Sequence, residues 1–294
     1  MSDRGVVFDL GYKPHEGPRL GTPGAFRAIV KDGLRRVLGL RRKARKKVMP
    51  FALLGIALLP AVVFVGLAFF VGEFTPDAES PFGGYEEYLA LSGTVLLIFS
   101  ALAAPELLVP DRVEGVLSVY SSRPLRARDY VAARATALLG LVAAFLVVPN
   151  LLMWVGFSAL GEGSFISEAI DGGGNFLRAL AASVVYVLAY GVPAMLPAIY
   201  TKRTAPASGV YLAAMLFSVP VADLLVSSGF TASRWGAMLS LLQHPHVVRD
   251  WLFGGSNNDL PSVNDFSPWM SLLVVLAIAA LTLTLGIRRY RREM

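Results

Sequence analysis

The chain has 294 residues, of which 55% are hydrophobic and 16% are charged, with a formal net charge of +6. A soluble globular domain carries about 25% charged residues, so this composition indicates an integral membrane protein. The sequence contains no cysteine, which excludes disulfides and cysteine-based metal sites. The three histidines are His15, His244 and His246. His244 and His246 are close in sequence, but no third metal ligand lies near them. We therefore interpret them as polar loop residues and not as a metal site.

Residues 1–23 are polar and rich in glycine and proline, which is typical of an extended segment without regular structure. The first long apolar run begins near Pro50. We therefore expect the amino-terminal segment to stay in the cytoplasm.

Between residues 24 and 40, apolar side chains recur every three or four residues. They are Phe26, Ile29, Val30, Leu34, Val37 and Leu38. Basic residues occupy other positions, so the pattern predicts an amphipathic elbow helix at the membrane interface. The alternative is a helix packed on a soluble domain, but no soluble domain here is large enough to receive it. The basic run 41–47 directly precedes the first apolar segment, which favours a topology signal over a nucleic-acid patch.

Six apolar segments follow, each long enough for a bilayer core, which takes about 20 residues. They cover about residues 50–72, 88–109, 130–160, 176–200, 205–227 and 268–287. The third is longer than a bilayer needs, so we expect its first turns to project into the cytoplasm. The sequence thus predicts an all-α integral membrane protein with six transmembrane helices.

The distribution of charge predicts the orientation of these helices. Of the 27 Lys and Arg residues, 24 lie before residue 50, in 110–134, in 201–204 or after residue 287, which leaves only Arg178, Arg234 and Arg249 for the opposite side. The loops of that opposite side hold most of the acidic loop residues instead. The positive-inside rule therefore places both termini in the cytoplasm.

The longest segment between spans, residues 228–267, contains many apolar residues among its polar ones. We expect two short helices, broken at His244–Pro245 and half-buried at the outer membrane surface. Residues 254–259 are predicted to form an exposed turn. We expect this segment to serve structural packing. Its position would also allow it to shape the exit of a transport path at the outer surface.

The span centres carry no charged residue. Glu106, Arg134, Arg178 and Asp223 all lie toward span ends. This argues against an ion-driven transporter, although unwound backbone can bind Na⁺ without a charged side chain. The chain has no GxxxxGK[ST] sequence, so it binds no nucleotide through a P-loop. We therefore expect no enzyme activity from the chain alone, and energy from a partner if transport is uphill.

A polar, basic island interrupts the apolar sequence between the second and third spans. It contains Pro105-Glu106-Leu107, Asp111-Arg112-x-Glu114-Gly115-x-Leu117, Ser122-Arg123-Pro124-Leu125 and Asp129-Tyr130. This pattern resembles the cytoplasmic loop of the ABC type-2 exporter permeases. The elbow helix, six spans and long segment before the last span agree with that family, so the resemblance covers about residues 24–290. The alternative is that the island is an ordinary cytoplasmic loop with the usual positive charges. Such a loop would explain the charged residues but not the positions of Gly, Pro, Leu and Tyr.

The resemblance implies that a helix near residues 111–120 docks on a separate ATP-binding subunit. The implied contact residues are Asp111, Arg112, Glu114, Leu117, Tyr120, Arg123, Pro124, Arg128, Asp129 and Tyr130, with Lys202 and Arg203 as a second contact. Leu117 and Tyr120, one turn apart, would present an apolar face to that partner. Asp129 sits where a carboxylate favours the start of the third span.

By the same resemblance, two ATP-binding subunits and a second permease chain, identical or homologous, are the expected partners, with membrane lipids around them and no nucleic acid. ATP and Mg²⁺ would bind the partner subunits, and no cofactor is expected in this chain. The implied location is the bacterial plasma (inner) membrane. Two other functions stay open: a membrane-embedded sensor or immunity-type protein without transport, and a secondary transporter. The sequence does not identify the substrate.

Overall fold

The computed structural model describes residues 21–40, 45–74, 84–121, 125–229, 233–256 and 258–294. These residues form helices joined by turns, with no strand among them. Six of the helical segments are long and apolar enough to cross a membrane. The predicted all-α class with six spans is therefore confirmed, and the chain is a multi-pass membrane protein by helix length and hydropathy.

The six spans lie close to their predicted positions. They are α2 (Arg45–Phe74), α3 (Tyr85–Val113), α5 (Ala127–Leu160), α7 with α8 (Gly173–Tyr186 and Val192–Tyr200), α9 (Thr204–Ser227) and α12 (Pro268–Tyr290). One difference is that α3 continues four residues beyond the predicted end at residue 109. The second span therefore carries the first residues of the island on its own last turn.

Shorter helices cap the spans at both ends. They are α1 (Gly21–Val37), α4 (Val116–Ser121), α6 (Phe165–Asp171), the 3-10 helix η2 (Ser233–Leu239), α10 (His244–Phe253) and α11 (Leu260–Val263). The sequence did not predict α6. It begins at Ser164, whose side chain accepts a hydrogen bond from the Ser167 backbone N–H at 3.3 Å.

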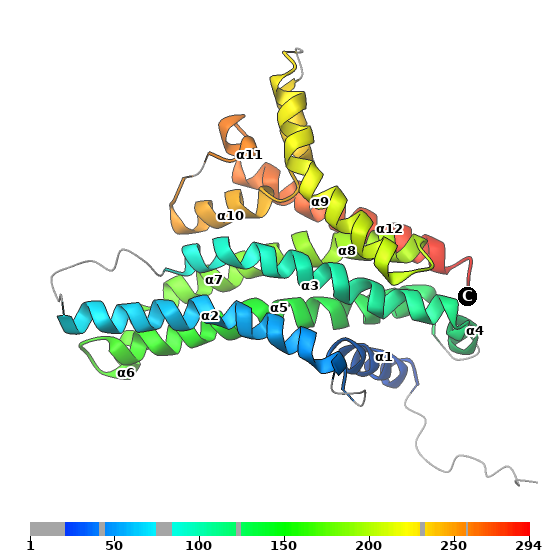
Figure 1. Cartoon of the computed structure of the whole chain (residues 1–294), viewed down its shortest axis with the longest axis horizontal. Coiled ribbons are helices and arrows are strands. Elements are labelled where there is room, and N and C mark those ends of the chain that lie inside the picture. Colours follow the sequence, from blue (N-terminus) through cyan, green and yellow to red (C-terminus); the bar gives the residue numbers. More distant parts are fainter. Residues whose placement is uncertain (1–20, 41–44, 75–83, 122–124, 230–232, 257) are drawn as a thin grey trace, which may run out of the picture.

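The spans α3 and α7–α8 form the interior of the bundle. In α3, 72% of the most apolar stretch is buried, against 17% in α2 and 22% in α9. In Figure 1, α2, α3, α5 and α7 run side by side, while the end of α9 that leads to Ser227 rises away from them. Large side chains such as Phe217 and Leu224 are exposed on α9. The peripheral spans thus present apolar faces to lipid or to another chain.

The fourth span changes its helical form near its middle. Residues Val187–Gly191 make a π-helical turn between α7 and α8. Pro193 lies just beyond this turn and has no N–H to donate to the carbonyl four residues earlier, which accounts for the local rearrangement. A Cβ on Gly191 would lie 2.9 Å from Leu139 Cδ2, so α5 packs closely at this point.

The segment between α9 and α12 contains the two predicted short helices and a third, α11, but the first break lies at residues 240–243 and not at His244–Pro245. The η2 helix ends at Leu239, and α10 begins at His244 with Pro245 in its first turn. His244 lies between Ser271 Oγ and the Met238 carbonyl, each 3.1 Å from one ring nitrogen. Burial lowers the pKa of His244 against the opposing effect of that carbonyl.

Further contacts hold the rest of this segment. His246 pairs with Asp259 at 3.3 Å, and Arg249 donates to Asp250 at 2.6 Å and to the Tyr186 hydroxyl at 3.4 Å. Among the described residues, no group of three or more His, Asp or Glu side chains is arranged to hold a metal ion. The interpretation of His244 and His246 as loop residues was wrong: both lie in α10, and His244 is fully buried.

Helix α1 lies across the spans at the end of the bundle that also carries α4 and the carboxyl terminus (Figure 1). We call this the basic end. The predicted apolar stripe of α1 faces the bundle: Ile29 and Val37 are buried, and Phe26, Val30, Leu34 and Leu38 pack against the core. The elbow helix is therefore held by α3 and α5 through its apolar face.

The closest approach of α1 to the bundle is at Gly33. A Cβ at this position would lie 2.8 Å from Ala137 Cβ on α5 and 3.1 Å from Leu107 Cδ2 on α3. We predict that Gly33→Ala lowers the free energy of unfolding in detergent by about 1–3 kcal/mol, the usual effect of overpacking. The matched control is Gly55→Ala on α2, where a Cβ meets nothing within 4 Å. Equal unfolding midpoints for the two variants would contradict this packing.

Candidate functional site at the basic end

The island begins on the last turn of α3 and not on a separate helix. Asp111 and Arg112 belong to α3, which ends when the Glu114 N–H donates to the Pro110 carbonyl at 2.9 Å. Gly115 then turns the chain with a φ of 69°, a conformation that glycine adopts without strain. The expected helix over residues 111–120 is therefore divided, and only Val116–Ser121 form the separate helix α4.

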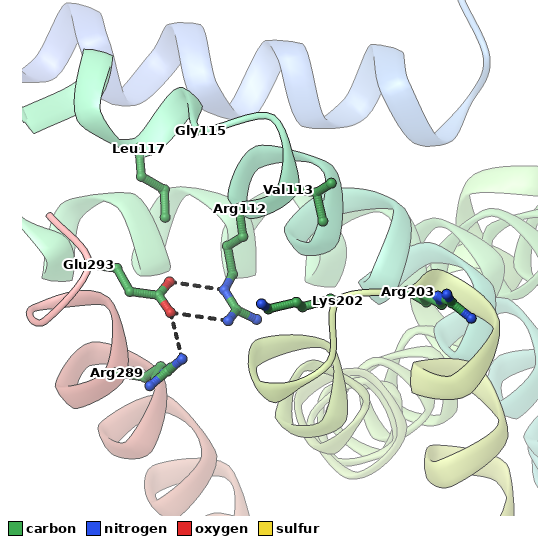
Figure 2. Close-up of a pocket in the computed structure, with 8 residues that line it drawn as sticks. All are labelled: Arg112, Val113, Gly115, Leu117, Lys202, Arg203, Arg289 and Glu293. Atoms are coloured by element: carbon green, nitrogen blue, oxygen red, sulfur yellow. Dashed lines mark hydrogen bonds and ion pairs between the residues drawn. The ribbon is translucent and has the colours of Figure 1, made fainter.

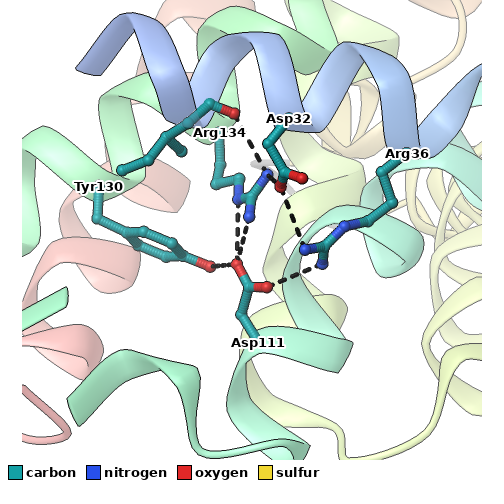
Figure 3. A network of polar contacts seen from close by, with 6 residues as sticks. Asp32, Arg36, Asp111, Tyr130 and Arg134 are labelled. Atoms are coloured by element: carbon teal, nitrogen blue, oxygen red, sulfur yellow. Dashed lines mark hydrogen bonds and ion pairs between the residues drawn. The ribbon is translucent and has the colours of Figure 1, made fainter. Parts of the chain in front are cut away.

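The Asp111 carboxylate is fully buried and lies at the centre of a polar network (Figure 3). Its Oδ1 accepts from Arg36 Nη1 at 2.8 Å. Its Oδ2 accepts from the Tyr130 hydroxyl at 2.8 Å and from Arg134 Nη2 at 2.6 Å and Nε at 3.1 Å. One carboxylate on α3 therefore binds side chains of both α1 and α5.

A second carboxylate completes the network. Asp32 on α1 accepts from Arg134 Nη1 at 3.0 Å and from Arg36 Nη2 at 3.2 Å. The Ile29 carbonyl lies 3.4 Å from Arg134 Nη1. Two arginines thus face two aspartates, so the buried charge is balanced, as burial of ions requires. Since Arg134 is fully buried, loss of either partner would leave a charge without compensation.

Arg112, the next residue along the chain, binds the opposite side of the basic end. Its Nε and Nη2 donate to the two carboxylate oxygens of Glu293 at 2.9 and 3.1 Å (Figure 2). Its Nη1 donates to the Ile199 carbonyl and, at 3.1 Å, to the Thr201 carbonyl. The side chain therefore joins α3 to the end of α8 and to the residues after α12.

Aromatic rings connect α4 to the same region. Tyr130 on α5 lies between Tyr120 on α4 and Tyr290 on α12, with ring centroids 5.8 and 5.0 Å away. Leu117 on α4 is only 5% exposed. Leu117 on α4 therefore faces inward, and Tyr120 is half-buried beside Tyr130. Contact of these two residues with a partner stays a prediction.

One exposed turn of the island lies just before α4. Val113 is 61% exposed, and Glu114 and Gly115 beside it are also exposed. These three residues follow directly after Asp111 and Arg112. A partner that contacts this turn would therefore act on the end of α3 itself.

A pocket of about 730 Å³ opens beside this turn. Its lining residues are Arg112, Val113, Gly115, Leu117, Lys202, Arg203, Arg289 and Glu293 (Figure 2). We call it the basic pocket, because four of these side chains are cationic and one is anionic. The structure thus brings the two predicted contact regions, the island and Lys202–Arg203, to the same pocket.

The remaining predicted residues lie at the start of the third span. Asp129 Oδ2 accepts from the Arg126 backbone N–H at 3.1 Å, so its predicted place at the helix amino terminus is confirmed. Arg128 is 60% exposed at its side chain and lies 3.6 Å from Asp129. Arg123 and Pro124 lie outside the described residues. Contact of these residues with a partner stays a prediction.

Four participants in the networks were not among the predicted site residues. Asp32 and Arg36 are separated by one helical turn on the polar face of the elbow helix, a spacing that favours an ion pair. The sequence identified Arg134 only as a charged residue near the end of a span. No sequence pattern indicated a role for Glu293, which lies among the basic residues that follow the last span. The contacts Arg36–Asp111, Arg112–Glu293 and Arg134–Asp32 join residues more than 70 positions apart in the sequence.

No known protein family matches the chain, and no curated protein matches it. Function is therefore inferred from the geometry of the site and from the resemblance of residues 105–130 to the permease loop.

The Asp111 network is expected to stabilise the fold. Because Asp111→Asn leaves Arg134 with a weaker partner, we predict a loss of about 3–5 kcal/mol of unfolding free energy in detergent. Arg134→Gln should cost a similar amount, and the double variant less than the sum, because neither charge is then left alone. Asp223→Asn, at an exposed position on α9, is the control and should change stability by less than about 0.5 kcal/mol. Additive losses in the double variant would show that the two residues do not act together.

Proposed function

We propose that the chain is the membrane-spanning subunit of an ATP-driven exporter of the ABC type-2 kind, which receives force from a separate ATP-binding subunit. Support comes from the resemblance of residues 105–130 to the loop of those permeases, and from six spans preceded by a packed elbow helix. The absence of a P-loop from the sequence fits a role in which hydrolysis takes place in the partner.

The observation that carries the proposal is the position of Asp111 and Arg112 beside an exposed turn. Val113 and Glu114 offer a contact surface, and the two preceding side chains connect that surface to α1 and α5 on one side and to α8 and the chain end on the other. Force applied at the turn would therefore reach α1, α5, α8 and the residues after α12 through short, charge-assisted hydrogen bonds. An ordinary loop between spans has no need of such connections.

The exposed apolar faces fit a paired arrangement. Much of α2 and α9 is uncovered within one chain, and a second permease chain, identical or related, would cover part of these faces and leave the rest to lipid. A path between two chains needs apolar walls more than buried charges, and the span centres of this sequence carry none. The same faces would be covered by lipid alone in a membrane sensor, so co-purification of an ATP-binding subunit separates the two functions.

The exposed turn gives a direct test. Val113→Asp places a charge in the proposed contact, where its desolvation would oppose binding. We predict that this variant keeps the wild-type unfolding midpoint but loses at least tenfold in affinity for the co-expressed ATP-binding subunit, measured by quantitative pull-down. Ile166→Asp is the matched control, because Ile166 is 71% exposed on α6 at the opposite end of the bundle. Its pull-down should equal that of the wild type.

Two results would contradict the proposal. One is unchanged binding and unchanged substrate-stimulated hydrolysis in the Val113→Asp complex. The other is robust ATP hydrolysis by the purified chain after removal of every ATPase subunit. Transport that depends on an ion gradient and not on ATP would point to a secondary transporter instead.

A further inference from the structure

The basic pocket already holds an anion, which belongs to the chain itself. The Glu293 carboxylate accepts two parallel hydrogen bonds from Arg112 and a third contact from Arg289 Nη2 at 2.8 Å. A guanidinium that presents two parallel N–H groups binds carboxylate and phosphate equally well by geometry. The pocket is therefore shaped for an anionic group.

The cations of the pocket exceed what Glu293 neutralises. Arg112, Lys202, Arg203 and Arg289 line it with one acidic side chain. Lys202 and Arg203 are exposed. The Nε of Arg289 is buried with no hydrogen-bond partner among the described residues, and an unsatisfied buried donor is unfavourable. The pocket thus keeps positive charge and volume for a second anion.

The location of the pocket indicates the source of that anion. Arg112 and Val113 end α3, Lys202 and Arg203 join α8 to α9, and Arg289 lies one residue before the end of α12. Since all these residues lie where spans end, we expect the pocket at the depth of the lipid headgroups. Basic pockets between spans on the predicted cytoplasmic side are suited to anionic lipid headgroups. Val113 and Leu117 add apolar surface next to the charges.

We propose that the basic pocket binds the phosphate of an anionic phospholipid headgroup and that Glu293 competes with this phosphate for Arg112. Arg112 remains in place when Glu293 leaves, because the Ile199 and Thr201 carbonyls hold its Nη1. Glu293 follows the end of α12, so its side chain can leave Arg112 without unwinding that helix. The site does not depend on the exporter assignment, because lipid surrounds any multi-pass membrane protein.

The test uses the full chain in a neutral detergent, with thermal unfolding followed while phosphatidylglycerol or phosphatidylcholine of the same acyl chains is added. Phosphatidylglycerol should raise the unfolding midpoint at concentrations at least tenfold lower than phosphatidylcholine. The double variant Lys202→Gln/Arg203→Gln should lose about tenfold or more of this apparent affinity. Glu293→Gln should gain about two- to fivefold, the factor that a partly exposed ion pair is worth.

The matched control is Arg291→Gln/Arg292→Gln, which removes two exposed charges from the same end of the chain but outside the pocket. It should keep wild-type affinity for phosphatidylglycerol. Equal losses of phosphatidylglycerol affinity in the two double variants would show only a general attraction of lipid to a basic surface. Equal shifts of the unfolding midpoint by the two lipids would exclude a site specific for the headgroup. Stabilisation by free glycerol phosphate at the same concentrations would indicate a soluble anion instead. Loss of ATP-binding subunit affinity without loss of lipid affinity in Lys202→Gln/Arg203→Gln would make the pocket a protein contact and overturn the proposal.

Discussion

The arrangement of the basic end depends on one buried carboxylate. Asp111 has no exposed surface, and its carboxylate accepts hydrogen bonds from three side chains on two other helices. Burial of an ion is unfavourable unless partners surround it, so the positions of α1 and α5 are constrained by the need to compensate this charge. Asp32 then balances the second arginine that the network introduces. The elbow helix is held by this requirement as well as by its apolar stripe.

Asp111 and Arg112 are adjacent in the chain but serve opposite sides of the bundle. On an α-helix, consecutive side chains point about 100° apart, so one residue reaches α1 and α5 while the other reaches the end of α8 and the carboxyl-terminal residues. The last turn of α3 is therefore the point where most helices of the basic end meet. A small displacement of this turn would change contacts in several spans at once, because packed interfaces shift between discrete arrangements. This geometry provides a route by which force applied at the island would reach the other helices.

The sequence predicted those features that depend on local periodicity and composition. Six apolar segments, the elbow stripe and the carboxylate at the start of the third span all follow from spacing of two to four residues or from runs of about twenty. The sequence did not predict which residues of the island are buried. Asp111, Leu117 and Tyr130 were expected at a surface, but the last turn of α3 and the inward face of α4 bury them. Whether a residue at a span end points inward is decided by helix rotation and by partners far away in the chain, such as Glu293, which no local pattern reveals.

The central claim is that the Asp111 network fixes the elbow helix against the third span. The chain has no native cysteine, so spin labels can be placed at Lys31 on α1 and Thr136 on α5, both exposed. Electron–electron double resonance would then measure the distance distribution between the two labels in lipid nanodiscs. The account predicts one narrow distribution in the labelled parent chain and in the Asp223→Asn control, and a broadened or shifted distribution after Asp111→Asn. An unchanged narrow distribution after Asp111→Asn would show that the apolar stripe alone holds the elbow helix, and would contradict the account.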